Sequence, residues 1–237
     1  WPHRWALYSF DVYINGSRVY DYTFELTESS YFTAGVLCHE FFHVLGAPDL
    51  YHYNENGAPD AVGGWDLMES TSNPPQYMGA FMKWKYGDWL PEIPEITATG
   101  TYTLNPLQQQ ENAAYKIASP NSETEYYVVE YRVKEGVYES NTPGSRDGLL
   151  VYRINTEAGN GNAQGPPDEV YLYRPGGTLT SQGSFVSAPY NADWSHTEIN
   201  NFTNPEPFLY NDGSGGQGGL NLLNVGHGGE TISFTVS

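Results

Sequence analysis

The residues at positions 39, 40 and 43 have the types and the spacing to bind a metal ion and use it for hydrolysis. They are His39, Glu40 and His43, in the order H-E-x-x-H within the stretch CHEFFHVLGAPD at 38–49. On a helix, residues three or four positions apart share one face, so both imidazoles can bind one ion, and neutral imidazole nitrogen is a good ligand for Zn²⁺. The carboxylate of Glu40 can accept a proton from water at the metal and pass it to a leaving amine, the general-base role in peptide hydrolysis.

The residues after His43 supply a candidate third ligand. Gly46 can end the helix in the left-handed conformation and turn the chain back. We therefore predict that His39, His43 and Asp49 form one site, in the extended pattern H-E-x-x-H-x-x-G-x-x-D. Two alternatives remain open: the histidines can lie on the surface of an ordinary helix, and Asp49, which follows Pro48, can be a turn residue.

The extended motif resembles the zinc signature of the metzincin clan, with aspartate where most members have a third histidine. Within that clan, HEFFHVLGAPDLY and the later GGWDLM at 63–68 resemble the M6 peptidases, the immune inhibitor A family of secreted bacterial metalloproteases. The resemblance implies a zinc endopeptidase that acts on proteins or peptides and is secreted or held at the cell surface. It also implies that Met68 forms the methionine turn beneath the metal, although a lone methionine is usually core filler.

Composition limits the partners and the stabilising forces. The chain of 237 residues has a net charge of −18 and a pI near 4.4, so nucleic acid and anionic membranes would repel it. Its single cysteine, Cys38, excludes an internal disulfide framework and is expected to be a buried, inert thiol. The excess of carboxylates can attract Ca²⁺, and the acidic loops at 147–148 and 211–213 are candidate sites without an EF-hand pattern.

Targeting signals are not recognisable in the sequence. No apolar run is long enough to span a bilayer, so membrane insertion is not expected. The first residues, WPHRWALY, lack a signal-peptide pattern, and we expect any export signal to have been removed or to lie outside this sequence.

Local patterns predict the elements that position the motif. In chain order these are a hairpin at 5–26, a helix at 32–46 with N-cap candidates at 27–30, a long functional loop at 49–75 and a second helix at 77–86. The hairpin turns at Asn15-Gly16. Its two apolar sets share one face only if the loop has three residues, 14–16, so we predict that loop with Gly16 left-handed.

Beyond the segment at 89–96, which two prolines interrupt, the pattern becomes β. Strands are predicted at 99–104, 114–117, 126–131, 149–154, 170–173, 219–223 and 231–236, and a loop at the Gly-rich stretch 213–219. Short strands separated by turn residues favour a β-sandwich of jelly-roll type. The predicted fold class is α+β, with a metzincin-like zinc peptidase domain at 1–91 and an all-β sandwich domain at 92–237.

The M6 resemblance continues into this β region, where EYYVVEYR, GLLVYRIN and GGETISFTVS are similar to segments that follow the catalytic part in the family. Arg153 stands in GLLVYRIN where relatives often have histidine, so no role is carried over to it. Metzincin catalytic domains usually place a longer sheet and another helix before the zinc helix, whereas 38 residues precede His39 here. The expected catalytic part therefore lacks its N-terminal portion.

Two other classes of function remain open. The 20 tyrosines and 6 tryptophans are compatible with a carbohydrate-binding module that exposes aromatic platforms, although strand aromatics usually pack in a core. An inactive, zinc-stabilised adhesion module would keep the metal site and lack turnover. Tyr77, shortly after Met68, is a candidate for supporting the oxyanion, with packing as its alternative. His52 is a candidate for contacting the ligand residues without binding the metal itself. The sequence does not predict the oligomeric state.

Overall fold

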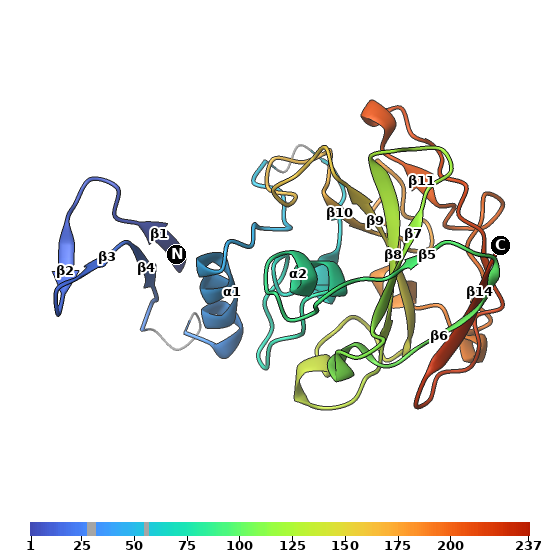
Figure 1. Cartoon of the computed structure of the whole chain (residues 1–237), viewed down its shortest axis with the longest axis horizontal. Coiled ribbons are helices and arrows are strands. Elements are labelled where there is room, and N and C mark those ends of the chain that lie inside the picture. Colours follow the sequence, from blue (N-terminus) through green and yellow to red (C-terminus); the bar gives the residue numbers. More distant parts are fainter. Residues whose placement is uncertain (28–31, 55–56) are drawn as a thin grey trace.

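The residues that the structure describes form a β-rich body with two short α-helices, and small β-ladders lie at the N-terminal end. The computed structural model describes residues 1–27, 32–54 and 57–237. In Figure 1 the first strands lie at one end, α1 lies between them and the rest of the chain, and the large sheet lies towards the C-terminus. The chain is α+β with mostly sheet, as predicted. Within the described ranges, no helix is long and apolar enough to cross a membrane.

The N-terminal end contains two separate antiparallel ladders. β1 (His3–Ala6) pairs with β4 (Asp21–Phe24), and β2 (Val12–Ile14) pairs with β3 (Ser17–Val19). Ile14 pairs with Ser17, so the loop contains only Asn15 (φ 51°) and Gly16 (φ 80°), both left-handed. The predicted three-residue loop is therefore wrong. It assumed a shared apolar face, but β2 is exposed on both faces, so the preference of Asn-Gly for a two-residue turn decides the loop.

The helix that carries the motif, α1 (Ala34–Val44), begins after Thr33, whose hydroxyl accepts from the Val36 amide at 3.3 Å. Most of the N-cap candidates at 27–30 lie outside the described residues. Gly46, just beyond the helix, has φ +100°, the left-handed conformation predicted for it. Cys38 is exposed, so the expectation of a buried thiol is wrong. It lies on the outer side of α1, beside the exposed Leu37.

Three sheets make up the β region. The five-stranded sheet has the order β10-β9-β8-β7-β5, the three-stranded sheet has the order β13-β14-β6, and β11 pairs with β12. The strands are β5 (Glu95–Ile96), β6 (Gly100–Leu104), β7 (Ala114–Ala118), β8 (Glu125–Arg132), β9 (Gly148–Asn155), β10 (Val170–Leu172), β11 (Phe208–Leu209), β12 (Gly216–Gln217), β13 (Leu222–Leu223) and β14 (Ile232–Val236). Short 3-10 helices occur at Gly63–Trp65, Leu107–Gln109, Val137–Glu139, Phe185–Ser187, Ala192–Trp194 and Asn211–Gly213.

All seven strands predicted for this region are present, although β13 covers only the end of its predicted range. Three strands were not predicted. β5 is the parallel edge strand beside β7. The other two are β11 and its partner β12, and β12 lies inside the stretch expected to be a loop. That expectation is wrong because β11, which is distant in sequence, supplies the pairing partner that local composition could not indicate.

The second helix, α2 (Ala80–Lys85), is shorter than the predicted 77–86. Its start is set by two buried carboxylates of other elements. The amide of Gly79 donates to Asp66 at 2.7 Å, and the amide of Ala80 donates to Glu130 of β8 at 2.5 Å. Gly79 is extended (φ −64°, ψ 164°), so the helix cannot continue towards residue 77.

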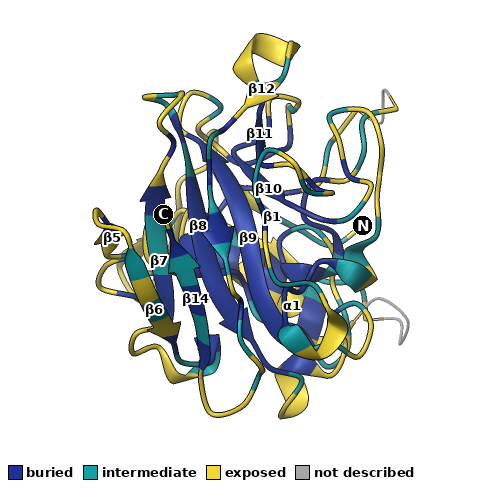
Figure 2. Cartoon of the chain, turned by 90° about the vertical axis from the view of Figure 1, so that its right-hand side faces the viewer, coloured by how far each residue is buried: buried dark blue, intermediate teal, exposed yellow. Residues whose placement is uncertain are grey.

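The core lies on both sides of β8 and β9, which are buried along nearly their whole length and appear dark blue in Figure 2. On one side the rings of Tyr102, Tyr115 and Phe234 join β6, β7 and β14, with centroids 5.7 to 6.4 Å apart. The buried apolar residues form one cluster from Phe42 in α1 to Val236 in β14. The motif helix and the β region therefore share a core, while the domain division at residue 91 and the sandwich arrangement stay predictions.

Candidate metal centre

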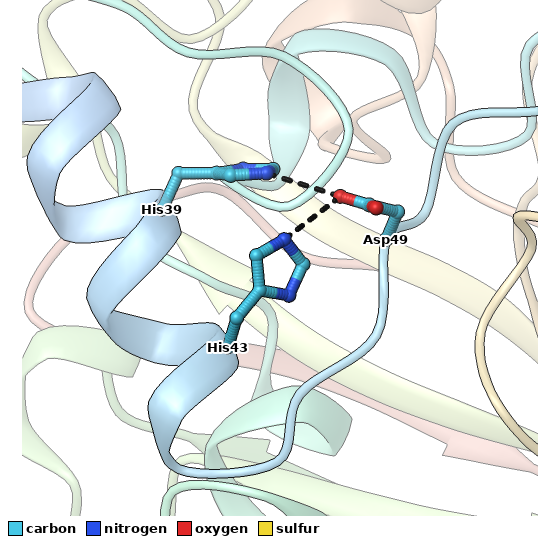
Figure 3. Close-up of side chains that lie close together, drawn as sticks. All are labelled: His39, His43 and Asp49. Atoms are coloured by element: carbon cyan, nitrogen blue, oxygen red, sulfur yellow. Dashed lines mark ion pairs between the residues drawn. The ribbon is translucent and has the colours of Figure 1, made fainter. Parts of the chain in front are cut away.

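The three predicted ligands lie together. His39 and His43 project from one face of α1 towards Asp49 on the loop that follows, as Figure 3 shows. Nε2 of His39 is 3.0 Å and Nε2 of His43 is 3.2 Å from Oδ1 of Asp49. In the part of the chain that the structure describes, this is the one group of three or more His, Cys, Asp or Glu side chains placed to hold a metal ion. Neither acidic loop considered for calcium forms such a group.

Backbone carbonyls fix which nitrogen of each imidazole faces Asp49. Nδ1 of His39 is 3.0 Å from the carbonyl oxygen of Leu67, and Nδ1 of His43 is 2.7 Å from that of Ala47. A carbonyl oxygen only accepts, so each Nδ1 carries a hydrogen and donates. The lone pair of a neutral imidazole is then on Nε2, the atom that faces Asp49, which is the arrangement found when histidine binds a metal.

Several lone pairs therefore meet with no hydrogen between them. Oδ1 of Asp49 is buried, and none of the described residues donates a hydrogen bond to it. Ligand atoms about 2.0–2.2 Å from a tetrahedral zinc ion lie roughly 3.3 Å apart, close to the observed 3.0 and 3.2 Å. The donor set and its spacing fit zinc, and a cation would satisfy the orphaned carboxylate oxygen.

The charges in the site favour a cation at the same place. Burial would lower the pKa of His43, but its contacts with Asp49 and with the Ala47 carbonyl raise that pKa above the ordinary value. Burial would raise the pKa of Asp49, but contacts with His39, His43 and Tyr53 hold it well below its usual range. Asp49 is thus an anion that requires a positive charge beside it, either a proton on His43 or a metal ion.

Asp49 presents only one oxygen to the histidines. The hydroxyl of Tyr53 donates to its other oxygen, Oδ2. The ring of Tyr51 contacts both neighbours: its centroid is 6.3 Å from that of His39, in a stacked arrangement, and 5.5 Å from that of Tyr53, in a tilted one. Neither tyrosine was predicted to be a site residue, although Tyr53 follows Asp49 by only four positions in the sequence.

Glu40 is buried and lines the same cleft as the ligands. A second carboxyl group, that of Glu25, lies near it. Burial raises the pKa of Glu25, and the charge of Glu40 raises it further. Both oxygens of Glu25 are buried without a hydrogen-bond partner among the described residues. The N-terminal segment thus brings an unpredicted acid close to the predicted base.

The cleft has a volume of about 840 Å³ and walls from three parts of the chain. One wall is β1, with the residues just before it. The second is α1 with the segment from Gly46 to Tyr53. The third comes from the β9–β10 connection at 156–169, which contributes Asn160, Ala163 and Gln164. Only the second wall was predicted from the sequence, because nothing in the local sequence marks residue 160 as a spatial neighbour of residue 49.

Other predicted residues lie around the centre without entering it. Met68 is fully buried, and its carbonyl accepts from the Leu50 amide at 2.9 Å. Tyr77 packs on Tyr138 at 5.4 Å with the ammonium of Lys83 over its ring, and it does not line the cleft. Its packing alternative therefore accounts for its position.

Two further histidines have acidic partners. His52 lines the cleft and is 2.6 Å from Asp168, in the β9–β10 connection. His227 pairs with Asp193, away from the cleft. His52 thus lies beside the ligands, which is the position for which it was a candidate. His227 instead pairs with Asp193 on the surface.

The loop that carries Met68 is held by buried charges. Asp66 accepts from the Met68 amide at 2.8 Å, and burial raises its pKa to about 6. Arg132 of β8 donates to the carbonyl of Trp65 at 3.1 Å. Because His39 donates to the carbonyl of Leu67, this loop connects the ligand helix to the central sheet.

The family comparison covers the N-terminal third of the chain. Residues 1–84, which include all four predicted site residues, match the model of the immune inhibitor A peptidase M6 catalytic domain. No curated protein and no solved structure matches the chain significantly. The match supports a metallopeptidase, and it confirms the resemblance inferred from the motif: residues 1–84 are similar to the M6 peptidase catalytic domain.

Proposed function

We propose that the chain is a zinc-dependent endopeptidase that hydrolyses peptide bonds in protein substrates. The observation that carries the proposal is the meeting of Nε2 of His39 and Nε2 of His43 at Oδ1 of Asp49, a buried carboxylate oxygen without a hydrogen-bond donor among the described residues. Glu40 lines the cleft beside them. The M6 match supports the same class of reaction.

Each residue has a distinct role in this proposal. His39, His43 and Asp49 would hold the zinc ion as its three protein ligands, the number typical of catalytic zinc sites. A bound zinc ion supplies acidification of water and polarisation of the scissile carbonyl. The carboxylate of Glu40 accepts the proton of the attacking water and returns it to the leaving amine. Asp49 is anionic, so it should lessen that acidification relative to a third neutral histidine.

The finer features implied by the resemblance belong to the same proposal. They are membership of the metzincin clan, secretion by a bacterium, and a catalytic part at 1–91 followed by a β-sandwich at 92–237. The end of the family match at residue 84, shortly before the proline-interrupted segment, supports the division. The shared core supports a β part that is packed firmly against the catalytic part.

The test combines metal content with activity. Purified wild type, Glu40→Gln and the control Glu92→Gln, which changes an exposed glutamate, are analysed by mass spectrometry for zinc and assayed with casein with and without chelator. We expect about one zinc per chain in all three and chelator-sensitive hydrolysis that only Glu40→Gln lacks. Zinc without turnover in wild type would favour the adhesion module instead. No zinc in wild type would refute the ligand assignment.

A further inference from the structure

We infer that the β9–β10 connection, residues 156–169, is part of the metal centre: it positions Asp49 as a ligand, and Asn162 is its positioning residue. The inference rests on the proposed zinc site. It extends that site to a segment outside the M6 match at 1–84. The helix fixes both histidines, but Asp49 lies beyond the end of α1 and needs another support.

The connection lies directly against the backbone of Asp49. The amide of Asn162 donates to the Asp49 carbonyl at 2.9 Å, and the amide of Tyr53 donates to the Ala163 carbonyl at 2.9 Å. Gly161 has φ +72°, and a Cβ there would lie 2.3 Å from the Asp49 carbonyl oxygen. Backbone therefore contacts backbone at the third ligand, and only glycine permits so close an approach.

The side chain of Asn162 joins the ligand segment to β10. It is fully buried, and its Nδ2 donates to the Leu50 carbonyl at 3.1 Å and to the Val170 carbonyl at 2.9 Å. Its Oδ1 accepts from the Val170 amide at 3.1 Å. Both functional atoms of this amide are used, so the residue after Asp49 is held to a strand of the central sheet.

The far end of the ligand segment is held by the same connection. His52 pairs with Asp168 at 2.6 Å, both nearly buried. Tyr53, whose amide is bound by Ala163, directs its hydroxyl to Oδ2 of Asp49. By holding the backbone of Tyr53, the connection therefore also orients the Asp49 carboxylate so that Oδ1 faces the histidines.

This arrangement has a definite consequence for metal affinity. Residues just outside the ligands orient them, and their loss typically weakens metal binding by about 10–100-fold. Asn162→Ala removes the three hydrogen bonds by which this side chain joins the ligand segment to β10, and it changes none of the ligand residues. It should therefore weaken zinc binding by about that factor while the histidines remain fixed by α1.

A matched variant separates positioning from general stability. Asn191 is also a buried asparagine of the β region, whose side chain bonds to the backbone of Asp147 and Asp193 rather than to residues 49–53. Zinc affinity is measured for wild type, Asn162→Ala and Asn191→Ala by competition with a chromophoric chelator. The visible absorption of the Co²⁺-substituted chains reports ligand geometry.

We expect weaker zinc binding and an altered Co²⁺ spectrum only in Asn162→Ala. The inference is overturned if folded Asn162→Ala binds zinc within about twofold of wild type, or if Asn191→Ala weakens zinc equally. Failure of wild type to bind zinc would instead refute the proposed function, and this inference with it.

A second measurement needs no variant. If the connection holds Asp49, then zinc bound at Asp49 must in turn stabilise the connection, because coupling between two sites is reciprocal. Hydrogen–deuterium exchange of wild type should therefore slow at 156–169 as well as at 49–53 when zinc is added. Protection at the motif without any change at 156–169 would overturn the inference even if Asn162→Ala failed to fold.

Discussion

Arg132 of β8 joins the loop that carries Met68 to the central sheet, and replacing it measures how much its buried ion pairs stabilise the fold. Its Nε and Nη2 donate to the two oxygens of Glu139 at 3.0 and 2.7 Å. Its Nη1 donates to Glu130 and to the Trp65 carbonyl, both at 3.1 Å. The side chains of the ion pairs are at most 1% exposed, so water cannot replace these partners. The substitution Arg132→Met keeps an unbranched apolar side chain and removes the charge.

The expected cost follows from these contacts. Removing one partner of a buried ion pair leaves an uncompensated charge and costs about 3–5 kcal/mol. The lost bond to Trp65 adds about 1 kcal/mol. Arg132→Met should therefore lower the free energy of unfolding by roughly 4–6 kcal/mol, a large part of the 5–15 kcal/mol typical of a folded protein.

Urea unfolding followed by tryptophan fluorescence measures this cost, with chelator present so that metal binding does not contribute. The control is Arg18→Met. Arg18 pairs with Asp11 at 3.0 Å, but these side chains are 46% and 72% exposed, so its loss should cost less than about 1 kcal/mol. A second variant, Arg132→Met with Glu139→Gln, should recover part of the loss because one buried charge is gone. Equal destabilisation by Arg132→Met and Arg18→Met would refute the assignment of Arg132 to a dry, charge-paired core.

Three further predictions concern the site and its surroundings. Tyr53→Phe removes the hydroxyl that donates to Oδ2 of Asp49. Because Tyr53 is half-exposed, the loss should weaken zinc binding, measured by chelator competition, only about fivefold. The control Tyr8→Phe, in the same cleft, should leave zinc binding unchanged. Burial raises the pKa of Glu69 to about 8, so the folded protein holds this carboxyl in its protonated form. The stability that comes from this protonation is complete below about pH 4.5 and is lost as the pH rises through 8. From pH 5 to pH 9 the Tm of wild type should therefore fall further than the Tm of Glu69→Gln, by an amount equivalent to a few kcal/mol of unfolding free energy. Identical Tm profiles for the two proteins would show that the Glu69 carboxyl is not buried. Gln164→Ala, in the cleft wall from the β region, should raise KM for a peptide about two- to tenfold with kcat and zinc affinity unchanged, and a fall in kcat alone would contradict its role in binding.

Spacing along α1 was enough to predict the centre. Residues one helical turn apart share a face in any helix, so His39 and His43 had to converge if the helix formed. Gly46 indicated where the chain turns, and its observed φ of +100° agrees. Seven strands of the β region were predictable for a similar reason, since alternation and turn residues act over a few positions.

Predictions failed where an element depended on its neighbours. The hairpin loop was predicted from a shared apolar face, but β2 has no buried face to share. Cys38 was predicted to be buried, yet the described residues leave the outer side of α1 exposed. Local sequence does not reveal which side of a helix the rest of the chain will cover.

Residue types and their spacing were sufficient to predict the helix that presents two imidazoles together and the similarity of the first 84 residues to the M6 catalytic domain. Tertiary structure decided the rest: which nitrogen faces Asp49, which residue holds its second oxygen, and which loop forms the third wall of the cleft. The bond from Asn162 to Leu50 joins residues 112 positions apart. No local propensity encodes such a pair, because it exists only after the sheet has packed against the motif and buried both partners away from water.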